Sequence, residues 1–346
     1  MNLRGKLFLL VFLLTLALGG VWPRTLPAIT PATAKLAVEG IEFVYQDKLE
    51  LALETFRKMY DTEPTTFIGD FYQCFTYELY MDEYKSTAYD SIFTYLSDRG
   101  IAVGETLLKQ SPTGENYLYL GGVYGVRGSR KGQFGDWWGA FKDGKKAYSL
   151  LKDCVNVDPN QQDAWYGIGL YHFWKSHKLR YLSWMPFISD QREEGRNQLR
   201  QAMENAAFAR EASRNALFRI HMEEKEYKAV LPLAREFGEK YPGDVFHRWY
   251  LGFALAYLNR WDDAIVCFKE NLQLLQDREH GLEAEVICWY WIARCQYEMH
   301  GASQESLDWL HKITVNAPLV DTRLFYYEEY LEKTEELKET ITKELE

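Results

Sequence analysis

Two sets of residues have the types and spacing of ligand-binding motifs, but each lacks a necessary member. Gly139, Gly144 and Lys145 spell G-x-x-x-x-G-K, which is the core of a loop that cradles nucleotide phosphates. Lys146 follows where that loop needs Ser or Thr to hold Mg²⁺, and no buried strand precedes it. We therefore expect no nucleotide site here and no cofactor.

His172 and His177 form the second set. They are five residues apart, without the H-E-x-x-H arrangement or the acidic partner that a zinc site needs. Asp262 and Asp263 are paired carboxylates, but adjacent helix residues do not face each other, and these two are more typical of a helix start. No nucleophile motif is present. The sequence predicts no metal site, no catalytic residues and no enzyme.

The cysteines also favour packing over chemistry. Their number is odd, no C-x-x-C pair occurs, and all of them fall inside predicted helices. A chain of 346 residues does not need disulfides to fold. We expect each thiol to be a small buried side chain. The five residues are Cys74, Cys154, Cys267, Cys288 and Cys295.

Composition predicts a folded, acidic protein. Hydrophobic residues make up 47% of the chain and aromatic residues 16%, which is enough to build a core. The formal net charge is −10, so nucleic acid is not an expected partner.

The N-terminus has the pattern of an export signal. Arg4 and Lys6 precede an apolar run over 7–18, which is shorter than a membrane-spanning helix needs. We expect a signal peptide over 1–19 and an extended proline-rich linker over 20–32. The mature chain would then be periplasmic or secreted, with no stable transmembrane span. An uncleaved segment, which would hold the protein at a membrane, remains the alternative.

Two repeated spacings organise the rest of the chain. Three Pro–Gly pairs are ten residues apart, namely Pro112–Gly122, Pro159–Gly169 and Pro242–Gly252. A second spacing of 12 and then 4 residues occurs twice, as Gly40, Ala52, Phe56 and as Gly252, Ala264, Phe268. Small residues let two helices approach, the phenylalanine fills the space beneath, and proline ends the unit. A period of about 34 residues predicts a solenoid of helical hairpins.

These spacings resemble the tetratricopeptide repeat family. Trp165, Ile168 and Gly169 match the Trp, Leu and Gly positions of its first helix. The resemblance implies an all-α, right-handed solenoid of about six repeats over 33–320, closed by a capping helix over 321–346. It also implies a concave groove that receives a peptide or another protein.

Two segments depart from the repeat at the joint between a first and a second helix. Between Gly122 and Ala147 lie more residues than the intact units have, and we expect an inserted loop over 123–139. A second loop is expected over 175–190. Equivalent joints of consecutive repeats line up along one edge, so the two loops should be neighbours.

Both loops are basic and aromatic on an acidic protein, which is a pattern typical of an anion or head-group site. The alternative is that the aromatic side chains hold long loops against the solenoid while the charges are solvated. The candidate ligand-binding residues are Arg127, Arg130, Lys131, Trp137, Trp138, Lys178, Arg180, Tyr181 and Trp184. The candidate groove residues are Tyr77, His172, Phe173 and Tyr257.

Two functions from different classes follow. The first is an exported scaffold that binds another protein or a peptide in its groove. The second is a periplasmic accessory protein that binds a small anionic or lipid-like ligand at the basic, aromatic edge, similar to repeat proteins associated with transporters.

Overall fold

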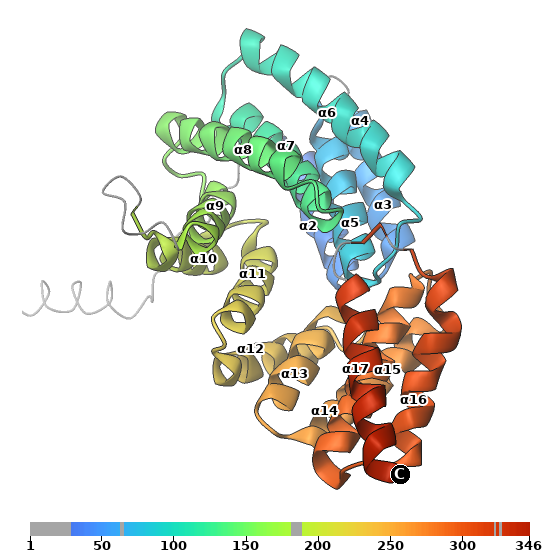
Figure 1. Cartoon of the computed structure of the whole chain (residues 1–346). Helices are drawn as coiled ribbons and strands as arrows, with labels where there is room; N and C mark the ends of the chain where they lie inside the picture. The colour runs from blue at the N-terminus through green and yellow to red at the C-terminus, as the bar shows by residue number, and fades with distance from the viewer. Residues whose placement is uncertain (1–28, 63–65, 181–188, 322, 325–326) are drawn as a thin grey trace, which may run out of the picture.

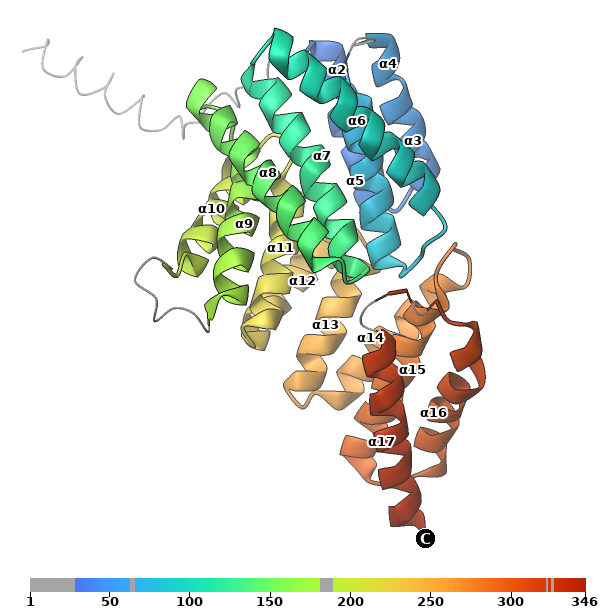
Figure 2. The same ribbon diagram turned by 45° about the horizontal axis from the view of Figure 1, so that its top comes forward.

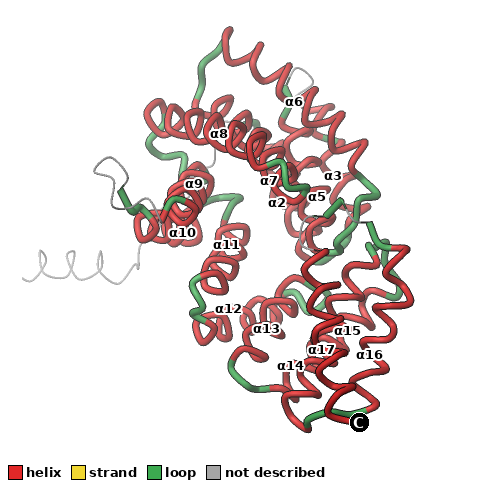
Figure 3. The backbone as a smooth tube through the Cα atoms, in the orientation of Figure 1, coloured by secondary structure: helices red, strands yellow, loops and turns green. Residues whose placement is uncertain are grey.

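The computed structural model describes residues 29–62, 66–180, 189–321, 323–324 and 327–346. Within these ranges the chain forms helices and short connections and no strand (Figure 3). This confirms the all-α class that the repeats predicted. The predicted signal peptide and most of the linker lie outside the described residues.

Seven hairpins follow one another along the described chain, one more than the six expected (Figure 1). They are α2 (Pro31–Tyr45) with α3 (Leu49–Arg57), α5 (Ile68–Glu83) with α6 (Asp90–Gln110), α7 (Gly114–Gln133) with α8 (Trp137–Val157), α9 (Ala164–Lys178) with α10 (Arg192–Asn205), α11 (Arg210–Glu223) with α12 (Tyr227–Lys240), α13 (Phe246–Tyr257) with α14 (Trp261–Leu275), and α15 (Leu282–His300) with α16 (Gln304–Asn316). Short helices α4 (Met59–Thr62) and η2 (Ala317–Leu319) follow α3 and α16.

The predicted capping helix is α17 (Tyr327–Leu345), which packs against α15 and α16. Leu337 and Ile341 of this helix enter the core that α13 to α16 share. Many of its glutamates, such as Glu335 and Glu339, face solvent. An apolar inner face and a charged outer face are what the end of a solenoid requires.

A single left-handed residue makes the turn inside six of the seven hairpins. Such a residue ends the first helix and reverses the chain within a few residues. The connection between α9 and α10 includes residues 181–188, which lie outside the described ranges. The six residues, with φ values of 53° to 76°, are Asp47, Lys85, Gly135, Lys225, Asn259 and Gly301.

The close helix approach inferred from the spacings is present. A Cβ atom on Gly40 would lie 2.2 Å from Cε1 of Phe56, and one on Gly252 would lie 3.0 Å from Cζ of Phe268. Both phenylalanines are fully buried. In each hairpin, therefore, the ring occupies the space that a larger residue in the glycine position would fill.

The first predicted loop is wrong, because residues 123–133 continue helix α7 and 137–139 begin α8. The glycines that suggested a loop instead form a packing face. A Cβ on Gly128 would lie 3.3 Å from the backbone oxygen of Ala140, and one on Gly132 would lie 3.8 Å from the Cβ of Ala140. Glycines every three or four residues let the two backbones approach over the extra turns of both helices. Gly139 and Gly144 are helical too, which excludes a phosphate-binding loop.

The two ends of the array meet, so the solenoid closes on itself (Figures 1 and 2). Tyr45, at the end of α2, packs edge-on against Phe237 of α12, with ring centroids 5.8 Å apart. The Trp249 indole N–H of α13 donates to the backbone oxygen of Glu83 over 3.1 Å. The Gly281 N–H before α15 donates to the backbone oxygen of Tyr84 over 2.9 Å. We call this set of contacts the closure.

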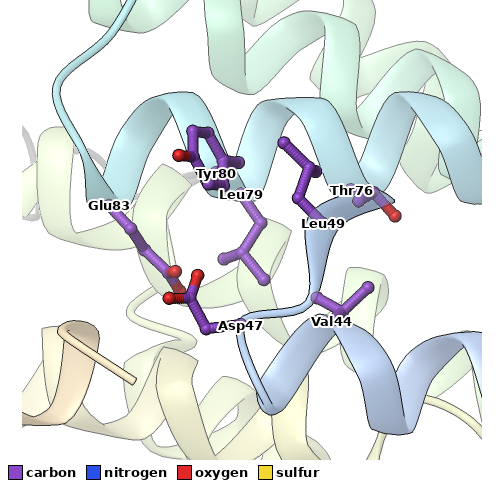
Figure 4. A pocket seen from close by; sticks show the side chains of 7 residues that line it. All are labelled: Val44, Asp47, Leu49, Thr76, Leu79, Tyr80 and Glu83. Atoms are coloured by element: carbon purple, nitrogen blue, oxygen red, sulfur yellow. The ribbon is translucent and has the colours of Figure 1, made fainter. Parts of the chain in front are cut away.

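Buried charge lies at the centre of the closure. Arg278 forms an ion pair with Asp47 at 2.5 Å, and the Tyr84 hydroxyl donates to the same carboxylate over 2.6 Å. Burial nevertheless raises the pKa of Asp47 to about 6. The carboxyl of Glu83 points toward that of Asp47 (Figure 4). Burial, and then the nearby Asp244, raise the pKa of Glu83 well above its usual value.

A small pocket lies beside these two carboxyls, with a volume of about 10 Å³. That is room for about one water molecule. Its lining residues are Val44, Asp47, Leu49, Thr76, Leu79, Tyr80 and Glu83. The pocket therefore belongs to the packing of the closure and is too small for a larger ligand.

Candidate binding surface

The predicted cations on α7 are paired with carboxylates of the protein itself. Arg127 donates from Nε to Oδ2 of Asp143 over 2.8 Å, and Lys131 donates to the same oxygen over 2.7 Å. Burial alone would raise the pKa of Asp143, but hydrogen bonds from Arg127 and Lys131 outweigh it and lower that pKa. An external anion is thus not needed to neutralise these two cations.

Arg130 is buried and has a structural role. Its guanidinium donates to Asp90 over 2.8 Å, to the side chain of Gln133 over 2.5 Å and to the backbone oxygen of Ser86 over 3.1 Å. It also lies over the ring of Phe134, 4.6 Å from the centroid. With 4% of its surface exposed, Arg130 joins the end of α7 to the start of α6 and has no face left for a ligand.

The two segments predicted to be neighbours do meet, at the start of α8 and the end of α9. The Lys178 ammonium lies 5.8 Å from the centre of the Trp137 ring. Arg180 contacts His177, with 2.6 Å between Nη1 and Nε2. Tyr181 and Trp184 lie outside the described residues. Trp137 and Trp138 are 52% and 71% exposed, so both are accessible from solvent.

Three of the four predicted groove residues are buried, so that prediction is wrong for them. Tyr77 and Phe173 belong to hydrophobic clusters, where they fill space between neighbouring helices. His172 is held between the Tyr148 hydroxyl at 3.1 Å and the Gln198 side chain at 2.8 Å. Tyr257 is 49% exposed, but its ring stacks on Tyr227 with centroids 4.6 Å apart.

A different accessible surface lies across α8 and α9. The rings of Tyr148 and Tyr171 stack with centroids 4.2 Å apart and planes at 17°. Lys152 lies 5.9 Å from the Tyr148 ring, and Lys175 lies 5.8 Å from the Tyr171 ring. His172 fixes the Tyr148 hydroxyl from behind, as described above. We call these two tyrosines and two lysines the tyrosine platform.

A shallow pocket of about 370 Å³ adjoins the platform. Its lining residues are Lys145, Tyr148, Ser149, Lys152, Asp153, Asn156 and Tyr171. The surface around it is rich in exposed lysines for which, in the described ranges, no carboxylate lies within ion-pair distance. These lysines are Lys142, Lys145, Lys146, Lys152, Lys175 and Lys178.

Sequence reasoning missed the platform because it sought the charged binding residues in the two predicted loops, and Tyr148 and Lys152 lie beyond the first of these. Lys145, Tyr148 and Lys152 are three and four residues apart, so they lie on one face of a helix. Tyr171 and Lys175 have the same relation on α9. The signal was present, but the search for cations was confined to the two predicted loops.

Cys154 lies on α8, the helix that also carries Tyr148 and Lys152. Burial raises the pKa of the Cys154 thiol to about 12, so the thiolate is not available as a nucleophile. All five cysteines are buried and unpaired, as the sequence predicted. Among the described residues, no group of three or more His, Cys, Asp and Glu side chains is placed to hold a metal ion. Nor is any described helix both long and apolar enough to cross a membrane.

Comparison with known proteins supports the fold. No family model matches the chain, and no curated protein matches it by sequence. The solved structure described as the APC/C hetero-tetramer Cut9–Hcn1 is similar, with a TM-score of 0.51 and 12% sequence identity. The match covers 91% of this chain and 57% of that one, so this chain spans little more than half the length of its neighbour. The neighbour is a tetratricopeptide-repeat solenoid, and the likeness shows that this chain has a fold of the same kind.

Proposed function

We propose that this protein is a non-catalytic scaffold that binds an acidic segment of a partner protein on the tyrosine platform. The observation that carries the proposal is the platform itself, two stacked rings with a lysine beside each. Carboxylates of a bound segment would pair with Lys152 and Lys175, while an apolar side chain would cover the rings of Tyr148 and Tyr171. A tetratricopeptide-like fold, which commonly presents binding surfaces, supports this function.

Binding in a central groove is less well supported than binding on the platform. Side chains of α2 and α5 pack against α11, α12 and α13 in one hydrophobic cluster. Tyr45 and Leu79 come from the first side of this cluster, and Phe218 and Phe246 from the other. A peptide that entered between them would have to open the closure and expose these buried side chains, which costs free energy.

The test uses fluorescent peptides of about twelve residues that carry four Glu or Asp and one aromatic residue. We expect anisotropy to report binding that weakens as salt increases, because the contacts are charged. Reversing two charges, by Lys152→Glu with Lys175→Glu, should weaken binding at least about tenfold. A peptide with Lys in place of each acidic residue should not bind.

The matched control reverses two exposed lysines elsewhere, Lys58→Glu with Lys343→Glu. Lys58 pairs with the exposed Glu54 and Lys343 with the exposed Glu339, so binding and folding should be unchanged. Equal loss in both double variants would attribute binding to net charge alone. Unchanged binding after Lys152→Glu with Lys175→Glu would remove the platform from the proposal.

We further propose that the protein is exported, on the basis of Arg4, Lys6 and the apolar run over 7–18. N-terminal sequencing of protein from a secreting host should then begin near Gly20. A full-length N-terminus on cytosolic protein would contradict export, and it would leave the platform proposal unaffected.

A further inference from the structure

The start of α8 carries a cluster of exposed aromatic side chains beside exposed lysines. Trp138 is 71% exposed and Phe141 46%, and their rings stack with centroids 5.9 Å apart. Trp137 adds a third exposed ring at 52%. Lys142 and Lys146 follow on the same helix. We call these five residues the α8 tip. They are separate from the four residues of the tyrosine platform.

The local structure holds the tip rigidly. Asp136 caps α8 by accepting a hydrogen bond from the Gly139 N–H over 2.9 Å. Gly135, with φ of 73°, makes the reversal that leads into this cap. The glycine-rich face of α7 holds α8 close along its length, and Arg130 fixes the turn through Phe134. Rigid aromatic anchors bind with a small loss of conformational entropy.

The charge around the tip is positive, although the whole protein carries −10. Asp143 is buried and already bonded to Arg127 and Lys131, so it does not offset Lys142 or Lys146. The carboxylate of Asp136 serves as the helix cap. In the part of the chain that the structure describes, neither of these two lysines has a carboxylate within ion-pair distance.

We propose that the α8 tip docks the protein onto an anionic lipid bilayer, with Trp138 and Phe141 entering the headgroup region and Lys142 and Lys146 contacting lipid phosphates. Tryptophan favours the membrane–water interface, and lysines are attracted to anionic lipid. Three rings on one helix end present far less than the roughly 800 Å² per partner of a standard protein interface. Aromatic side chains next to lysines suffice for reversible binding to a bilayer surface.

The test measures co-sedimentation of the full chain with two kinds of vesicle, phosphatidylcholine alone and phosphatidylcholine with 30% phosphatidylglycerol, in about 0.1 M salt. An apolar N-terminal segment would bind both kinds, so the excess binding to the anionic vesicles reports the tip. We expect that excess to be at least about tenfold. Each lysine near an anionic surface contributes about fivefold, so Lys142→Glu with Lys146→Glu should remove this excess.

A second variant tests the rings. Trp138→Ala with Phe141→Ala should remove most of the anionic excess and should also reduce quenching of tryptophan fluorescence by brominated lipid. The matched control, Tyr95→Ala with Leu319→Ala, removes two large exposed side chains elsewhere and should bind like wild type. Circular dichroism at 222 nm checks that each variant is folded.

Three outcomes would overturn the proposal. The first is equal binding of the wild type to both kinds of vesicle. The second is an aromatic variant that binds vesicles like the control. The third is a tip variant that loses binding of the acidic peptide but keeps binding to vesicles. The last would make the tip part of a protein interface. Lys152→Glu with Lys175→Glu should retain most of the vesicle binding, so failure of the platform proposal and failure of this one are distinguishable.

Discussion

Replacement of Arg130 by methionine should destabilise the fold, because the guanidinium joins three groups that would lose their donor. Asp90, Gln133 and the backbone oxygen of Ser86 all accept hydrogen bonds from it. Hydrogen bonds to charged groups contribute about 1.5–3 kcal/mol each, but the carboxylate of Asp90 is partly exposed and can regain water. We therefore expect the free energy of unfolding to fall by about 2–4 kcal/mol.

Urea unfolding followed by circular dichroism at 222 nm measures this change, with the slope of the transition compared as well as its midpoint. The matched control is Arg260→Met, since Arg260 pairs with Asp263 and both side chains are about half exposed. That variant should lose less than about 1 kcal/mol. A loss below about 1 kcal/mol for Arg130→Met would refute the structural role and return Arg130 to the candidate ligand residues.

Two other changes test the packing and the closure. Gly169→Leu should lower the free energy of unfolding by about 2 kcal/mol or more, because a Cβ there would lie 2.8 Å from the backbone oxygen of Gly195. Equal stability of wild type and variant in urea unfolding would contradict this close approach. Glu83→Gln should raise the free energy of unfolding at pH 8 by about 1 kcal/mol. Burial raises the pKa of Glu83 in the folded state, so the folded protein binds more protons than the unfolded protein. Wild type therefore loses stability as pH rises, and the glutamine variant avoids this loss. Asp47, with a pKa of about 6, also lowers the stability of the fold as pH rises from about 4 to 6. The stability of Glu83→Gln should therefore depend less steeply on pH than that of wild type. Identical profiles of stability from pH 5 to 8 would contradict the assignment.

The helical packing could be predicted from the sequence, because it depends on residue size at fixed spacing. Gly40 with Phe56 and Gly252 with Phe268 are in contact as expected. The extra turns of α7 and α8 could not be predicted, since a segment with many glycines is also typical of a flexible loop. What distinguishes the two is their spacing of three or four residues opposite Ala140, Gly144 and Ala147 on the next helix.

The binding residues were harder to predict than the fold, because paired and unpaired cations look alike in a sequence. Arg127 and Lys131 share Asp143, which lies just beyond the predicted loop over 123–139. Lys152 and Lys175 were not among the candidate residues, and neither has a carboxylate within ion-pair distance among the described residues. The closure could not be predicted from sequence spacing either. Tyr80, whose hydroxyl donates to the backbone oxygen of Glu279, is 199 residues away from it in the chain.

That separation affects how the protein is made. An open array can fold one repeat at a time as it leaves the ribosome, and it can gain a repeat by duplication at either end. Here Asp47 cannot form its ion pair with Arg278, and the backbone oxygen of Tyr84 cannot accept from Gly281, until residues 278–281 have been synthesised. The surfaces of the first two hairpins that form the closure therefore stay exposed until most of the chain has been synthesised. A duplicated or deleted unit would move the two ends out of register, so the closure fixes the number of hairpins that the molecule can have.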